Sequence, residues 1–115
     1  MRTGFTVDLF LSVVACEVAT RGETNAFLAR LLRSEVGVID WALLKDPLEG
    51  RRFGGYSASL RILIDDPRVV SSEVAAEFVE AMTSRWSGVV DVSVGSCNRY
   101  VVARDYHRGA FLAAS

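Results

Sequence analysis

The sequence has few of the residues on which metal sites and disulfide frameworks depend. Its 115 residues contain one histidine, His107, and two cysteines, Cys16 and Cys97. A four-ligand zinc site would have to combine all three with a carboxylate, and small secreted disulfide domains usually contain four or more cysteines. We therefore expect no metal, no cofactor and no disulfide, and free thiols of the kind found in a reducing cytoplasm.

An excess of charge of one sign is also missing. Thirteen basic and fourteen acidic residues give a formal charge of −1, and the two signs are interspersed. The chain lacks the basic stripe of a nucleic-acid binder, and no stretch approaches the roughly 18 apolar residues of a membrane helix. These absences argue against nucleic acid or a membrane as a partner. Lysine is nearly absent too, because all basic residues except Lys45 are Arg. This preference for Arg indicates a high-GC bacterial or phage source.

The first 16 residues have two interpretations. Val13-Val14-Ala15-Cys16 resembles the end of a lipoprotein signal, but Asp8 interrupts the apolar stretch before it. Apolar residues also recur at every second position from Phe5 to Val13, which is typical of a strand with one buried face. We favour a strand over 5–16 in a cytoplasmic protein, with a cleaved signal as the alternative.

Further elements follow at regular intervals. A Thr20-x-x-Glu23 capping box predicts a helix to about Ser34, and a second helix is predicted from Ser71 or Ser72 to Ser87. Strands are predicted over 38–45, 57–65 and 89–94, with a glycine-rich loop over 46–56. Residues 95–98 predict a turn into a further strand over 99–106, or else a bulge at Gly95 within one long strand.

This order predicts one α+β domain over residues 1–106, followed by a tail at 107–115. The β-α-β-β-α-β succession matches a ferredoxin-like sandwich, in which an antiparallel sheet carries two helices on one face. A terminal hairpin would add a fifth strand. The fold alone does not identify a function, because many unrelated proteins share it.

Three surfaces are candidates for partner binding. The sheet face opposite the helices is expected to present Phe10, Val14, Trp41, Arg61 and Leu63. The loop before the third strand offers Arg51 and Arg52 for an anionic group and Phe53 and Tyr56 for stacking. Glu73, Glu77 and Glu80 recur on one face of the second helix and would suit a basic partner. Each surface is also compatible with plain solvation.

Catalytic patterns are weak. Cys97, Asp105 and His107 are the residue types of a thiol nucleophile with its base, but their spacing does not bring them together. We assign no catalytic residue. The prediction is a non-enzymatic interaction protein, either a homodimer or a small inhibitor or immunity-type protein with one protein partner. The alternative is a small cofactor-independent enzyme or ligand binder of the dimeric α+β barrel kind, using Trp41, Tyr56, Tyr100, Tyr106 and His107.

Overall fold

The computed structural model describes residues 2–13, 21–49 and 56–106. Its elements, in chain order, are β1 (Arg2–Val13), α1 (Arg21–Arg33), β2 (Val38–Glu49), β3 (Tyr56–Ile64), α2 (Ser72–Ser84) and β4 (Val89–Val102). The α+β class and the β-α-β-β-α-β order agree with the sequence prediction. Neither helix is long and apolar enough to cross a membrane, in the part of the chain that the structure describes.

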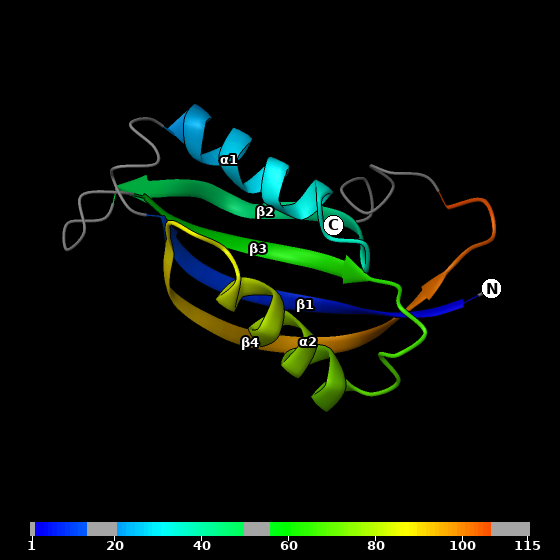
Figure 1. The fold of residues 1–115 in the computed structure, drawn as a ribbon. Coiled ribbons are helices and arrows are strands. Elements are labelled where there is room, and N and C mark those ends of the chain that lie inside the picture. Colours follow the sequence, from blue (N-terminus) through cyan, green and yellow to red (C-terminus); the bar gives the residue numbers. More distant parts are fainter. Residues whose placement is uncertain (1, 14–20, 50–55, 107–115) are drawn as a thin grey trace.

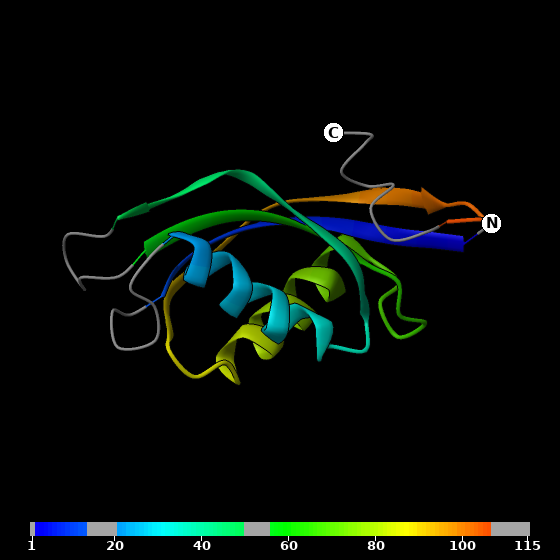
Figure 2. The ribbon, with the colours of Figure 1, turned by 90° about the horizontal axis from the view of Figure 1, so that it is seen from above.

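The four strands form one antiparallel sheet in the order β2-β3-β1-β4. Both helices lie on the same side of this sheet, α1 over β2 and α2 over β4 (Figures 1 and 2). This arrangement is compatible with a ferredoxin-like fold. It leaves the opposite face of the sheet, which we call the open face, without a helix.

The main core lies between the helices and the sheet. The odd-numbered residues of β1 from Phe5 to Val13 are buried there, as the period-two pattern predicts. The helices supply Leu28 and Leu32 from α1 and Val79 and Met82 from α2, all at most 2% exposed. Glu35 links the segments that follow the two helices, because its carboxylate accepts hydrogen bonds from Arg85 and from the Trp86 indole.

The predicted cap of α2 is confirmed, while its end differs from the prediction. The Ser71 hydroxyl accepts a hydrogen bond from the backbone N–H of Val74, which satisfies one of the free donors of the first turn. The helix ends at Ser84 rather than Ser87. Gly88 adopts a φ of 86°, a left-handed conformation that suits glycine, and leads the chain into β4.

The predicted turn at 95–98 is wrong, and the alternative of a bulge at Gly95 is confirmed. Residues 89–102 form one strand, in which Cys97 pairs with Val7 and Val94 pairs with Leu9. Two residues of β4, Gly95 and Ser96, therefore lie opposite one residue of β1, Asp8, which is the spacing of a β-bulge. Within the described residues the sheet has four strands, and the predicted fifth strand is not among them.

Candidate functional site

The open face is built from the even-numbered residues of β1 and the residues opposite them on β3. Thr6 pairs with Leu63, Asp8 with Arg61, Phe10 with Ser59 and Ser12 with Ser57. Directly opposed residues of an antiparallel pair point to the same side, so all eight lie away from the helices. Phe10, Arg61 and Leu63 therefore lie on the face predicted for them. Val14 lies outside the described residues.

An ion pair occupies the middle of the open face. Arg61 Nε lies 2.7 Å from Asp8 Oδ1, and Arg61 Nη2 lies 3.1 Å from Asp8 Oδ2. Two parallel contacts make this a bidentate pair, the geometry for which the guanidinium group is suited. The hydrogen bonds that Arg61 donates to Asp8 raise the pKa of Arg61, against a smaller opposing effect of burial. Both side chains keep some exposure, so the pair remains within reach of a docked partner.

The C-terminal part of the described chain covers one end of the open face. A second, smaller apolar cluster there contains Ala42, Leu63 and Val102, with Tyr106 packed against it. The Tyr106 hydroxyl donates a 2.5 Å hydrogen bond to the buried carboxylate of Asp40. Leu63 is fully buried as a result, although it points away from the helices. It is therefore a core residue at this end and not part of the exposed surface.

The other end of the open face carries one exposed aromatic ring among short side chains. Phe10 is 42% exposed. It pairs with Ser59 on β3 and with Ser93 on β4, and the neighbouring hydroxyls of Ser12 and Ser57 lie 3.3 Å apart. We call Phe10 and these four serines the Phe10 patch.

Trp41 does not lie on the open face, contrary to the sequence prediction. It pairs with Ile62, a buried residue of the helix-covered face, and packs against the main core. The cause is a register shift, since β2 has one more residue than β3 between the pairs Val38–Ile64 and Asp40–Leu63. One extra residue moves every later side chain to the other face. Asp40 and Ala42 therefore take the open-face positions.

Of the two other surfaces predicted for partner binding, the loop before β3 lies mostly outside the described residues, whereas the acidic face of α2 is described. Arg51, Arg52 and Phe53 lie outside the described residues, and Tyr56 is half-buried against the main core at the start of β3. Glu73, Glu77 and Glu80 are all exposed on α2. None of these three acids makes an ion pair with another residue in the ranges that the structure describes.

The residues considered for chemistry do not converge. Cys97 lies within β4 and faces the main core, while Asp105 is exposed beyond the end of that strand and His107 is outside the described residues. Burial raises the pKa of the Cys97 thiol, and nearby Glu73 raises it further, against a hydrogen bond with Ser72 that lowers it. Trp41 and Tyr56 contact the main core, whereas Tyr100 and Tyr106 belong to the cluster on the other side of the sheet. Within residues 2–13, 21–49 and 56–106, no group of His, Cys, Asp and Glu could hold a metal ion.

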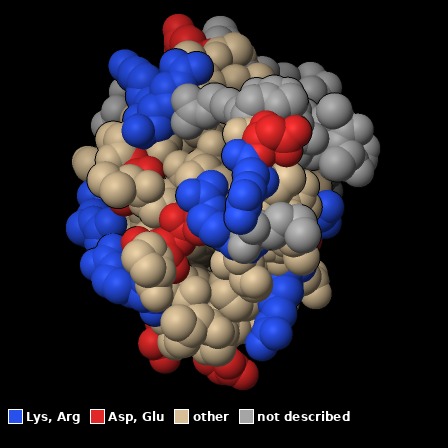
Figure 3. All heavy atoms as spheres, turned by 90° about the vertical axis from the view of Figure 1, so that its right-hand side faces the viewer, with Lys and Arg blue, Asp and Glu red and all other residues tan. Residues whose placement is uncertain are grey.

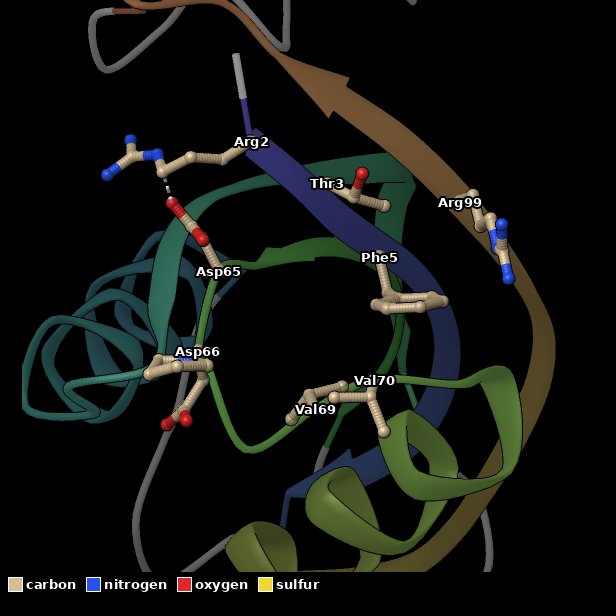
Figure 4. A pocket seen from close by; sticks show the side chains of 9 residues that line it. Arg2, Thr3, Phe5, Asp65, Asp66, Val69, Val70 and Arg99 are labelled. Atoms are coloured by element: carbon tan, nitrogen blue, oxygen red, sulfur yellow. Dashed lines mark ion pairs between the residues drawn. The ribbon is translucent and has the colours of Figure 1, made fainter.

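A cleft of about 670 Å³ opens at the end of the sheet where β1 begins and β3 ends. We call it the end cleft. Acidic and basic side chains lie beside each other on this end of the molecule (Figure 3). Arg2 and Arg99 stand on opposite sides of Phe5, and the turn between β3 and α2 supplies Val69 and Val70 (Figure 4).

Sequence reasoning missed the end cleft. By its composition, the run Asp65-Asp66-Pro67 indicates only the end of a strand. The lining comes from the start of β1, the end of β4 and the turn before α2, which are far apart in the chain. Only the strand order places these three segments together.

Comparisons with protein-family models, with curated proteins and with solved structures find no match to this chain.

Proposed function

We propose that this chain is a non-enzymatic, cytoplasmic protein-interaction module of ferredoxin-like fold that forms a homodimer through the Phe10 patch. The observation that carries the proposal is the isolation of Phe10, a half-exposed aromatic ring with a serine on each neighbouring strand. Aromatic side chains are the commonest anchors of protein interfaces. Short hydroxyl side chains beside the ring leave room for a partner's side chains to approach.

A second copy suits this surface because the face carries both signs of charge. Asp8 and Arg61 lie side by side next to the patch. A two-fold axis places the same surface of one copy against that of the other, so the partly exposed Asp8–Arg61 pair of one copy can lie beside the opposite charges of the partner's pair. A partner with a strongly charged surface of one sign would lose this complementarity.

The test is the mass of the full chain in solution, measured by light scattering over a range of protein concentrations. We expect twice the chain mass of 12.6 kDa for the parent protein. Phe10→Asp places a charge at the centre of the interface and should give the monomer mass. Val36→Asp is the matched control, because Val36 is 96% exposed at the end of α1, away from the open face, and this variant should remain a dimer. A parent that stays monomeric, or a Phe10→Asp variant that stays dimeric, would contradict the proposal.

A second candidate is a small inhibitor that binds one basic protein partner. It is favoured by Glu73, Glu77 and Glu80 on α2, which are exposed and make no ion pair with another described residue. Replacement of all three by Lys should then abolish capture of a defined partner from a lysate of the source organism, while the dimer mass is unchanged. If the triple variant captured the partner as well as the parent does, the acidic face of α2 would have no role in binding.

A further inference from the structure

The end cleft has the size of a small-molecule site and is unused by the proposed dimer. Its volume of about 670 Å³ lies within the range of ligand pockets in proteins, roughly 300–1,000 Å³. Thr3, Phe5 and Arg99 lie on the helix-covered side of the sheet, because Phe5 pairs with Arg99 and belongs to the main core. The Phe10 patch lies on the other side. A ligand in the cleft and a second copy on the patch would therefore occupy different surfaces.

The charges that line the cleft are largely paired within the protein itself. Arg2 Nε lies 3.0 Å from Asp65 Oδ2. Asp66 accepts two side-chain hydrogen bonds from Arg68, at 3.1 and 2.8 Å, and one from the Arg68 backbone. Both acids that line the cleft are thus neutralised by arginines, which leaves neither of them available for a cationic ligand.

Arg99 is the exception on the cleft wall. It makes no ion pair with any residue in the part of the chain that the structure describes. Two arginines and two aspartates line the cleft, and Arg68 adds a third positive charge beside Asp66. The charges of these described residues therefore sum to +1, and Arg99 is the one among them without an ion-pair partner in the described chain.

The rest of the lining is apolar. Phe5 and Val69 form the base of the cleft and are almost fully buried, while Val70 is 69% exposed at its mouth together with Pro67. An exposed valine over a buried aromatic ring offers a surface that an apolar ligand can cover. Among the described residues of the lining, only Thr3 carries a hydroxyl group.

We propose that the end cleft binds a small monocarboxylate with an apolar body, its carboxylate held by Arg99 and its body packed over Val69 and Val70. The guanidinium group binds carboxylates through two parallel hydrogen bonds, which favours this anion over a neutral group of the same size. The apolar part gains by covering Val70.

The test uses three probes with the same alkyl chain and different charges: octanoate, octanol and octylammonium. Each is titrated into the ¹⁵N-labelled full chain, and the amide shifts of Thr3, Phe5, Val69, Val70 and Arg99 are followed by NMR. We expect octanoate to shift these amides and to bind about 1.5- to 5-fold more tightly than octanol, the range expected for an exposed charged contact. Octylammonium should bind more weakly than either.

Two variants assign the contact. Arg99→Gln should reduce the affinity for octanoate to that for octanol, whereas the control Arg104→Gln removes an exposed arginine outside the lining and should bind as the parent does. Val70→Asp places a carboxylate at the mouth and should abolish octanoate binding, and its exposure makes the substitution compatible with folding. The proposal is overturned if the three probes bind equally, if octanoate shifts none of these amides up to its solubility limit, or if Val70→Asp and Arg99→Gln bind octanoate as the parent does. The solution mass of the protein is unaffected by any of these results, so this test and that of the dimer fail separately.

Discussion

Tyr106 donates a hydrogen bond to Asp40 across 66 positions of sequence, with 2.5 Å between the phenol oxygen and Oδ2. Asp40 is 2% exposed on the edge strand β2, and Tyr106 follows the opposite edge strand β4. The bond therefore joins the two edges of the sheet across its open face. It also holds the aromatic ring over the apolar cluster of Leu63, Ala42 and Val102.

Loss of this hydrogen bond should destabilise the fold. Tyr106→Phe keeps the ring over the cluster and removes only the hydroxyl, and a hydrogen bond to a buried carboxyl group is worth about 1–3 kcal/mol of unfolding free energy. Urea denaturation of the parent, Tyr106→Phe, Asp40→Asn and the double variant measures the coupling between the two side chains. We expect the double variant to lose less stability than the sum of the single variants. Strict additivity would show that the contact contributes nothing.

The addition of one methyl group should destabilise the fold at Gly4 and have almost no effect at Gly95. A Cβ at Gly4 would lie 2.7 Å from the carbonyl oxygen of Ile64 in the paired strand and 3.2 Å from Val102 Cγ2. Neither atom can move far without loss of strand pairing or of the second cluster, so Gly4→Ala should cost about 1–3 kcal/mol of unfolding free energy.

Gly95→Ala is the matched control in the neighbouring strand. Its Cβ would meet the nearest atom, the Asp8 carbonyl oxygen, at 3.5 Å, which is an ordinary contact. We expect a change within about 0.5 kcal/mol, since the loss of chain entropy in the unfolded state offsets small strain. Thermal unfolding of both variants separates the two cases. Equal losses at the two sites would contradict the crowding that the structure assigns to Gly4.

The strands differ in how far the sequence could predict them. The facing of β1 could be predicted because apolar residues recur at every second position from Phe5 to Val13, and the facing of β3 followed from Leu60, Ile62 and Ile64, although Leu63 is buried on the other face as well. The facing of β2 could not be predicted from the sequence. The register shift between Val38 and Asp40 depends on how β2 pairs with β3 and not on the composition of β2. Gly95 to Asn98 has the composition of a turn, yet pairing with β1 keeps these residues in one bulged strand. The end cleft depends on the order of the strands and has no local signal.

Cys97 should react slowly with alkylating reagents at neutral pH. Burial raises the pKa of its thiol, and only the thiolate is nucleophilic. In a Cys16→Ser background, we expect the alkylation rate by iodoacetamide to be lower than that of the urea-unfolded chain and to keep rising with pH beyond the ordinary thiol value of 9.0. Glu73→Gln should move this profile to lower pH, because it removes a negative charge that disfavours the thiolate. A fast reaction with an inflection below 9.0 would instead support a nucleophilic role for Cys97.

The turn between β3 and α2 should contribute to stability only while Asp66 is ionised. The side-chain hydrogen bonds from Arg68, followed by the one from its backbone, lower the pKa of Asp66 from 3.8 to about 2. Because the folded value is lower than the unfolded one, this contribution is complete above pH 3.8 and is lost as the pH falls towards about 2. The turn is at the surface and Arg68 is largely exposed, so we expect a small effect.

A comparison of three proteins separates the effect of Asp66 from that of the other carboxylates, because the other carboxylates are the same in all three proteins. Urea unfolding is measured for the parent, Asp66→Asn and Arg68→Gln at intervals across this acidic range. The parent should lose the most stability as the pH falls, and Asp66→Asn the least, since its amide does not titrate. Arg68→Gln should lie between them, because it retains the backbone hydrogen bond from residue 68 and loses the side-chain contacts. Parallel pH profiles for the three proteins would mean that the Arg68 contact does not hold Asp66 in its charged form.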